Sequence, residues 1–238
     1  MAEFLSILSD TVSLLVQWDS ELREIILLSL QVSLSALTIA ITIGLPMAMV
    51  LTAYRFRGER LIYIVVDTLM ALPPVVVGLT VYLLLSRIGP LGVWGLLYTP
   101  TAMIIAQSLL ITPIVIALSL QIFRNHWPLL KDQFTVLGVN RVRMLFILLH
   151  EARFGLTTVV LAAFGRAIAE IGAVMVVGGN IANETRVMTT AIAMETQQGN
   201  LHMAMALGMV LILLALLINS CVHFFGHRRP RKWDRRHA

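Results

Sequence analysis

Long apolar runs separated by short polar or charged stretches dominate the pattern of this chain. A helix needs about 20 apolar residues, at about 1.5 Å per residue, to cross the hydrocarbon core of a bilayer. Five runs meet this length, at residues 25–53, 61–85, 99–123, 154–178 and 202–226. Because the runs are continuous rather than alternating, the pattern predicts helices and not a β-barrel. The expected fold class is all-α, a polytopic membrane protein with five transmembrane helices.

The rest of the chain divides into two ends and one substantial loop. Residues 1–24 include a run, at 4–18, that is too short to span, so we expect an interfacial segment lying on membrane lipid. The transmembrane domain is expected over 25–226, with a cytoplasmic loop at 124–153, and residues 227–238 form a basic tail.

Composition supports a membrane protein and limits what else the chain can hold. Of its 238 residues, 58% are hydrophobic and 13% are charged, against about 25% charged in a typical soluble domain. The mean hydropathy is +0.86. The chain has no room for a soluble ATPase domain and no Gly-x-x-x-x-Gly-Lys-Ser/Thr loop, so any ATP chemistry belongs to another polypeptide.

The net charge of +5 is a topology signal rather than a sign of nucleic-acid binding, because the basic residues flank the apolar runs. A cytoplasmic C-terminus places fourteen of the 18 Lys and Arg residues inside, as the positive-inside rule requires. The predicted topology therefore has the N-terminus outside and the C-terminus in the cytoplasm.

Arg166 and Glu170 lie one helical turn apart inside the fourth run. An ionisable side chain at that depth costs roughly 2.5 to 3.5 kcal/mol on insertion scales, so it usually faces a bundle interior or a water-filled path. Three interpretations stay open: a structural ion pair, direct contact with a transported cargo, and a proton relay. Small residues beside the pair predict that this helix is closely packed in the bundle.

Other polar or helix-breaking residues have two interpretations each. Pro73 and Pro74 interrupt the second run, which either opens a transport path or makes a packing kink. Gly178, Gly179 and Asn180 end the fourth run, where they either present backbone amides to an anion or form a tight turn. Hydroxyl and amide groups, Gln107 among them, can line a path or bond between helices.

The cytoplasmic loop contains a basic, amphipathic segment. Residues 130–139 alternate apolar and polar positions at helical spacing, so we expect a short cytoplasmic helix broken near Gly138. Such a helix either rests on the inner leaflet or docks on a partner protein.

The six histidines show no repeated ligand spacing, so we predict no metal site, and no nucleophile with a base is found within the runs. The single Cys221 has no partner in the chain for a disulfide. The chain is thus expected to lack catalytic residues and to bind no cofactor of its own.

Three motifs carry a family resemblance. Asp132-Gln133-Phe134, with Gly138 at the family's spacing, resembles the EAA loop of ABC importer permeases. The run GRAIAEIGAVMVVGGN, at 165–180, together with TRVMTTAI at 185–192, resembles oxyanion permeases of the molybdate and tungstate type. LPPVVVG in the second run is similar to their second-span motif. The family's Leu-Pro falls here on His150-Glu151, which is a departure from the pattern.

The resemblance implies a type I importer permease in the plasma membrane of a bacterium or archaeon, carrying tungstate first and molybdate second. It implies a homodimer, two cytoplasmic ABC ATPase subunits that hold the ATP, and an extracytoplasmic oxyanion-binding protein. The expected ATPase-coupling residues are Lys131, Asp132, Gln133, Phe134, Leu137 and Gly138. The expected pathway or gate residues are Arg166, Glu170, Pro73, Pro74, Gly178, Gly179 and Asn180.

Alternatives are an ABC permease for another anion such as sulfate, an ion-coupled secondary transporter, and an intramembrane enzyme. The secondary transporter predicts inverted repeats, whereas the proline-broken second run has no visible counterpart in the second half of the sequence.

Overall fold

The computed structural model describes residues 20–54 and 57–226, with side chains as far as Cys221. The basic tail at 227–238 and most of the expected interfacial segment at 1–24 lie outside the described residues, and residues 20–24 already belong to a helix. The elements are α2 (Ser20–Ala53), α3 (Glu59–Met70), α4 (Pro74–Leu85), η1 (Gly92–Trp94), α5 (Pro100–Val136), α6 (Arg141–Glu151), α7 (Arg153–Ile168), α8 (Gly172–Gly178), α9 (Met188–Gln198) and α10 (Leu201–Gly226). The described part is thus all-helical, which confirms the fold class.

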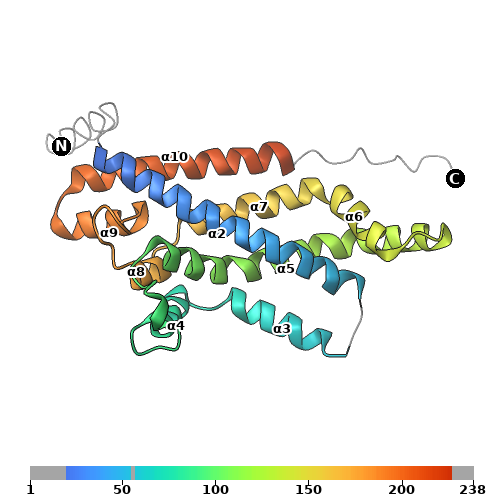
Figure 1. Ribbon diagram of the computed structural model, residues 1–238. Coiled ribbons are helices and arrows are strands. Elements are labelled where there is room, and N and C mark those ends of the chain that lie inside the picture. Colours follow the sequence, from blue (N-terminus) through green and yellow to red (C-terminus); the bar gives the residue numbers. More distant parts are fainter. Residues whose placement is uncertain (1–19, 55–56, 227–238) are drawn as a thin grey trace.

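The long helices lie side by side and the short ones gather at their ends (Figure 1). α2 packs along α5, and α7 packs against α2, α5 and α10. α4, α8 and α9 lie near the end where α2 begins, while α6 lies toward the opposite end. Clusters of buried apolar residues follow this layout, with Met103 and Val174 between α5 and α8, and Phe123 and Leu148 between α5 and α6.

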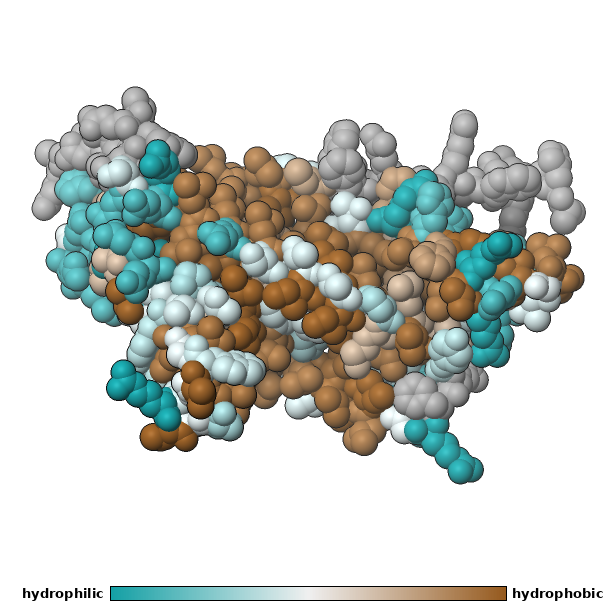
Figure 2. Space-filling view, viewed as in Figure 1, coloured by the Kyte–Doolittle hydropathy of each residue, from teal (hydrophilic) through white to brown (hydrophobic). Residues whose placement is uncertain are grey.

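Three described helices, α2, α5 and α10, are long and apolar enough to cross a membrane. Two bent pairs raise the number of candidate spans to five, with α3 and α4 meeting at 98° and α6 and α7 meeting at 68°. The face in view is largely hydrophobic along the middle, and hydrophilic residues gather at the end where α2 begins (Figure 2). The first, third and fifth apolar runs therefore correspond to α2, α5 and α10, and the second run corresponds to the bent pair α3–α4. The fourth run corresponds to α7 with α8, whereas the bent pair α6–α7 begins before this run, at Arg141.

The fourth run differs from the expected continuous helix. α7 ends at Ile168, and α8 begins only at Gly172. The run therefore contains a break at 169–171, as the second run does at 71–73. No proline marks this break; side chains from other helices bind backbone carbonyls there.

The short separate helix expected over 130–139 is not found there, because most of these residues belong to the end of α5. α5 continues to Val136, since the first residue that stops it is Gly138, with a φ of 66°. The amide of Gly138 donates to the Thr135 carbonyl at 3.2 Å, and the amide of Val139 donates to the Phe134 carbonyl at 3.0 Å. This is a Schellman ending. The separate short helix is α6, whose first turn is capped by Asn140.

Candidate functional site

The break between α7 and α8 is closed by the side chain of Glu170. Its Oε1 accepts a hydrogen bond from the amide of Ala173 at 3.2 Å, which satisfies a free donor in the first turn of α8. Its Oε2 pairs with the Nη1 of Arg166. Glu170 is 4% exposed and the Arg166 side chain is 40% exposed, so the carboxylate is buried and the guanidinium is only partly covered.

Side chains from two other segments bind carbonyls at the break, of which that of Ala167 also accepts from the Glu170 amide at 3.1 Å. The Nε2 of Gln107, on α5, donates to the Ala167 carbonyl at 3.0 Å. The hydroxyl of Thr189, on α9, donates to the Glu170 carbonyl at 2.8 Å. An unsatisfied carbonyl inside a bilayer costs several kcal/mol, so these bonds make a break without proline possible.

A void of about 10 Å³ lies among these groups, lined by Ser29, Ser33, Gln107, Glu170, Thr189 and three apolar neighbours. The Oε1 of Gln107 is buried there without a hydrogen-bond partner among the described residues. The void is about the size of one water molecule, and polar residues line it beside apolar ones.

The second broken span packs directly on the first. Pro73 caps α4 and Pro74 is its first residue, where a missing amide costs nothing. A Cβ on Gly78 of α4 would lie 2.7 Å from the Cα of Ala173, and a Cβ on Gly172 would lie 2.8 Å from a methyl group of Val75. The two half-helices, α4 and α8, therefore touch through glycine with no room for a larger side chain.

The residues after α8 form a closed turn. Gly179 has a φ of 70°, and a Cβ added to it would lie only 2.8 Å from the ring of Tyr98. The hydroxyl of Thr185 donates to the Gly178 carbonyl at 2.6 Å and accepts from the Ile181 amide at 3.0 Å. Asn180, with a φ of 52°, is buried and donates to the sulfur of Met194. This geometry is that of a tight turn packed against the loop before α5.

The predicted coupling residues lie together at the opposite end of the molecule. Lys131, Asp132 and Gln133 are exposed on the last turns of α5, and Phe134 is half-buried. Leu137 is 70% exposed beside Gly138, at the turn between α5 and α6. An exposed leucine with an open glycine beside it leaves an apolar tip without a partner in the described chain.

Next to this tip, sequence reasoning missed an open groove of about 890 Å³ between the end of α2, the start of α3 and the end of α5. Arg124 pairs with Glu59 at 3.5 Å and lies 4.1 Å from the centre of the Tyr63 ring. Lys131, Asp132 and Gly138 line the groove as well. Glu59 and Tyr63 are one helical turn apart, but Arg124 is more than 60 residues away in the sequence, so no local motif could reveal the pairing.

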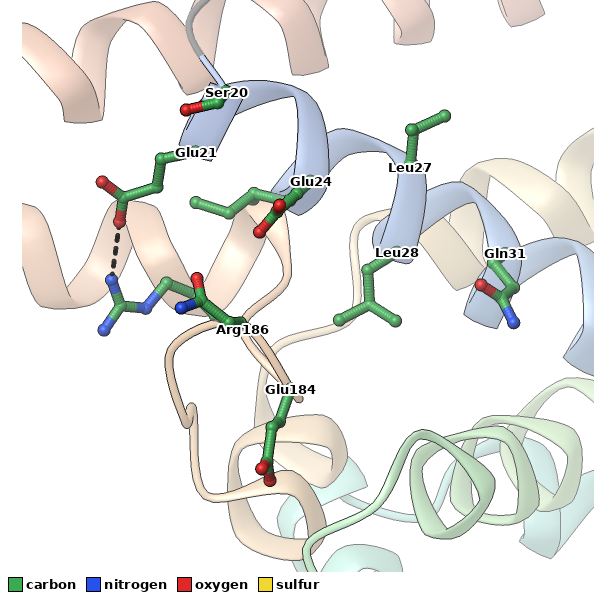
Figure 3. A pocket seen from close by; sticks show the side chains of 10 residues that line it. Ser20, Glu21, Glu24, Leu27, Leu28, Gln31, Glu184 and Arg186 are labelled. Atoms are coloured by element: carbon green, nitrogen blue, oxygen red, sulfur yellow. Dashed lines mark hydrogen bonds and ion pairs between the residues drawn. The ribbon is translucent and has the colours of Figure 1, made fainter.

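A second hollow missed by sequence reasoning, of about 650 Å³, lies at the end where α2 begins (Figure 3). Arg186, on the loop before α9, pairs with Glu21 of α2 at 3.0 Å and reaches Glu195 at 4.0 Å. Glu24 and Glu184 also line the hollow, so carboxylates outnumber cations. The acidic residues at the start of α2 were the available signal. Among the described residues, no group of three or more His, Cys, Asp or Glu is placed to hold a metal ion.

Comparison with protein families gives a match over most of the chain. The family model described as "Binding-protein-dependent transport system inner membrane component" matches residues 40–231. Both broken spans, the tip at Gly138 and the turn after α8 lie inside the matched region.

Individual relatives agree in class. The chain is 42% identical to the tungstate uptake system permease protein TupB of Peptoclostridium acidaminophilum, over 88% of this chain and 92% of that protein. It is 39% identical to a probable anion ABC transporter permease protein of Haloferax volcanii, with the same shares covered. A solved structure of the MetNI methionine ABC transporter, facing inward, superposes with a TM-score of 0.72 at 15% identity, covering 91% of this chain and 98% of that one. That likeness shows the fold.

Proposed function

The chain belongs to the family of binding-protein-dependent transport system inner membrane components, and from this membership we propose that it carries a tetrahedral oxyanion, tungstate first and molybdate second. It is the transmembrane permease subunit of an ABC importer and a multi-pass protein of the plasma membrane. The single observation that carries the choice of cargo is the 42% identity to a tungstate permease over 88% of the chain.

Partners follow from the family at a coarse level. Importers of this class work with an ATPase and with a binding protein. We propose two copies of this chain, two cytoplasmic ATPase subunits that hydrolyse the ATP, and an extracytoplasmic protein that delivers the anion. The chain itself takes part in no chemical step, since the relatives are permease subunits.

We propose that the ATPase grips the end of α5 and the turn that follows it. Lys131, Asp132 and Gln133 are exposed there, Phe134 anchors the helix, and Leu137 with Gly138 forms the apolar tip. ATP shifts the permease between inward and outward access only if the ATPase binds the two states with different free energies. A helix of 37 residues that continues unbroken from the bundle into this tip suits the transmission of that difference.

We propose that the two broken spans form the moving part of the pathway. Pro73 and Pro74 set one break, and Arg166 with Glu170 sets the other. Gly178, Gly179 and Asn180 close the outer end of the unit as a turn. Half-helices packed through glycine can shift together while their breaks absorb the change in direction.

Competition in an uptake assay tests the cargo. Cells or proteoliposomes with the complete transporter should take up tungstate, and excess molybdate should compete better than excess sulfate. If sulfate competes as strongly as tungstate, the chain is a permease for another anion. Transport that persists without any ATPase would favour the ion-coupled alternative.

A further inference from the structure

Arg166 lies near the middle of the fourth apolar run, residues 154–178. It is 13 residues after the start of α7 at Arg153, which is about 20 Å along a helix. The hydrocarbon core is about 30 Å thick. Arg166 is the one Lys or Arg within the five apolar runs of the sequence.

Its guanidinium is only partly used within the protomer. Among the described residues, Nη1 bonds Glu170 and the other nitrogens form no hydrogen bond, while 40% of the side chain is exposed. A guanidinium has five N–H donors in a fixed fork that suits oxyanions. Leaving these donors in lipid would cost about 2.5 to 3.5 kcal/mol on insertion scales, so the open side must face water or a second copy.

The surface around Arg166 is unlike a lipid-facing surface. Ala162 and Ala169, four residues before it and three after it, are exposed on the same side of the span and are small. By contrast, the exposed positions of α10 include Ile212, Leu213, Leu216 and Leu217. Large aliphatic side chains suit lipid, whereas alanines beside a guanidinium leave room for an ion.

We propose that Arg166 of each protomer contributes to a transit site for the oxyanion, with Glu170 as the positioning residue that aims the guanidinium. This inference rests on the proposed function for the identity of the cargo and for the pairing of two copies. The symmetry of a homodimer places two such arginines across the pathway, and each offers its unused donors to a tetrahedral dianion.

Glu170 also explains why such a site releases its ion. The carboxylate is fixed by Ala173 and Arg166 together, so it holds the guanidinium without competing for its open side. The pair carries no formal net charge, which keeps the attraction for a dianion moderate. Conduction needs a site that binds well enough to admit an ion and weakly enough to lose it.

Cysteine accessibility tests the site without disturbing the ion pair. In a Cys221→Ser background, Ala162→Cys and Ala169→Cys should react with an anionic, water-soluble thiosulfonate, and excess tungstate should slow the reaction. Leu216→Cys on α10 is the control for lipid exposure and should react slowly, with or without tungstate. All variants are assayed in the complete transporter. The proposal is overturned if the cysteines at 162 and 169 react no faster than the cysteine at 216. It is also overturned if tungstate does not slow their reaction.

A second measurement separates a transit site from a purely structural pair. Arg166→Gln/Glu170→Gln leaves no unpaired charge and keeps an acceptor for the Ala173 amide. Its maximal rate of tungstate uptake should fall at least about tenfold, as for the loss of one charge-assisted hydrogen bond. KM and the ATPase stimulation by loaded binding protein should stay near wild type, because glutamine at position 170 still accepts from the Ala173 amide and so keeps the break that the ATPase cycle moves. An unchanged maximal rate overturns the proposal, whereas a wild-type complex that transports no oxyanion refutes only the proposed function.

Discussion

Glu170 sits where three constraints meet. Its carboxylate accepts from the Ala173 amide at the start of α8, pairs with Arg166, and lies in a buried position where a lone charge would be unstable. The spacing of four residues in the sequence was enough to predict that the two charges meet. It was not enough to predict that the helix stops between them.

A double-mutant cycle on the pair gives the first prediction. Arg166→Ala leaves the buried carboxylate of Glu170 without a counter-charge, which should destabilise the protein by about 3 kcal/mol. Arg166→Ala/Glu170→Gln removes that charge and should recover part of the loss. Thermal unfolding of the purified permease in nanodiscs measures both. If the destabilisation of the double variant equals the sum of those of Arg166→Ala and Glu170→Gln, the pairing is contradicted.

The missing information at this scale is tertiary. Gln107 lies 60 residues before Ala167 in the sequence, and Thr189 lies 19 residues after Glu170. Sequence reasoning offered Gln107 as either a path-lining or an interhelical group, and the structure gives it the interhelical bond. No local pattern shows which carbonyl a distant amide will find.

At the scale of elements, helix ends with local signals could be predicted. Pro73 and Pro74 end the continuity of the second span, and Gly138 ends α5, as their backbone preferences require. The break at 169–171 contains neither proline nor glycine. The apolar run of 25 positions that includes it, residues 154–178, therefore looked continuous. The end of α5 was placed too early, because a charged stretch was taken for a loop.

The contact between α4 and α8 gives the second prediction. Gly78→Val should destabilise the fold by roughly 1 to 3 kcal/mol, since its side chain must displace the backbone of Ala173. Gly208→Ala on α10 is the matched control, because no atom lies within 4 Å of the added Cβ. The control should be neutral or slightly stabilising. Thermal unfolding measures both, and equal midpoints for the two variants would argue against a close α4–α8 contact.

The turn after α5 gives the third prediction. Gly138→Asp adds a carboxylate to the apolar tip, where no neighbouring atom blocks it, and should abolish uptake while the protein still inserts in the membrane. Gly199→Asp is the control, since Gly199 is also open and has a comparable φ of 80°. It lies on the other side of the membrane in the predicted topology and should transport normally. Uptake per inserted protein compares them, and normal uptake by Gly138→Asp would refute docking at the tip.

For the whole molecule, the arrangement of charge agrees with the topology predicted from the sequence. Basic residues such as Arg141 and Arg143 lie near the α5–α6 turn, while Glu21, Glu24 and Glu184 gather around the hollow at the other end. Membrane insertion retains Lys and Arg on the cytoplasmic side. The acidic hollow is therefore expected to face outward.

Labelling of single cysteines gives the fourth prediction, again in a Cys221→Ser background. An impermeant maleimide should label Gly199→Cys at the outer surface of intact membranes. Gly138→Cys should be labelled only after the membranes are opened. Both positions are exposed, so a difference in labelling reports the side of the membrane and not burial. Labelling of Gly138→Cys from outside would reverse the topology.

The glycine contact between α4 and α8 has a mechanical consequence. Where side chains separate two helices, they can change rotamer and so absorb part of a displacement of one helix against the other. Here the backbones meet at Gly78 and Ala173 with no side chain between them, so we expect the two half-helices to move as one unit. In the proposed dimer, each protomer would then move one rigid pair of half-helices instead of two half-helices that adjust independently. A gate built this way switches abruptly and has few half-open positions through which ions could leak.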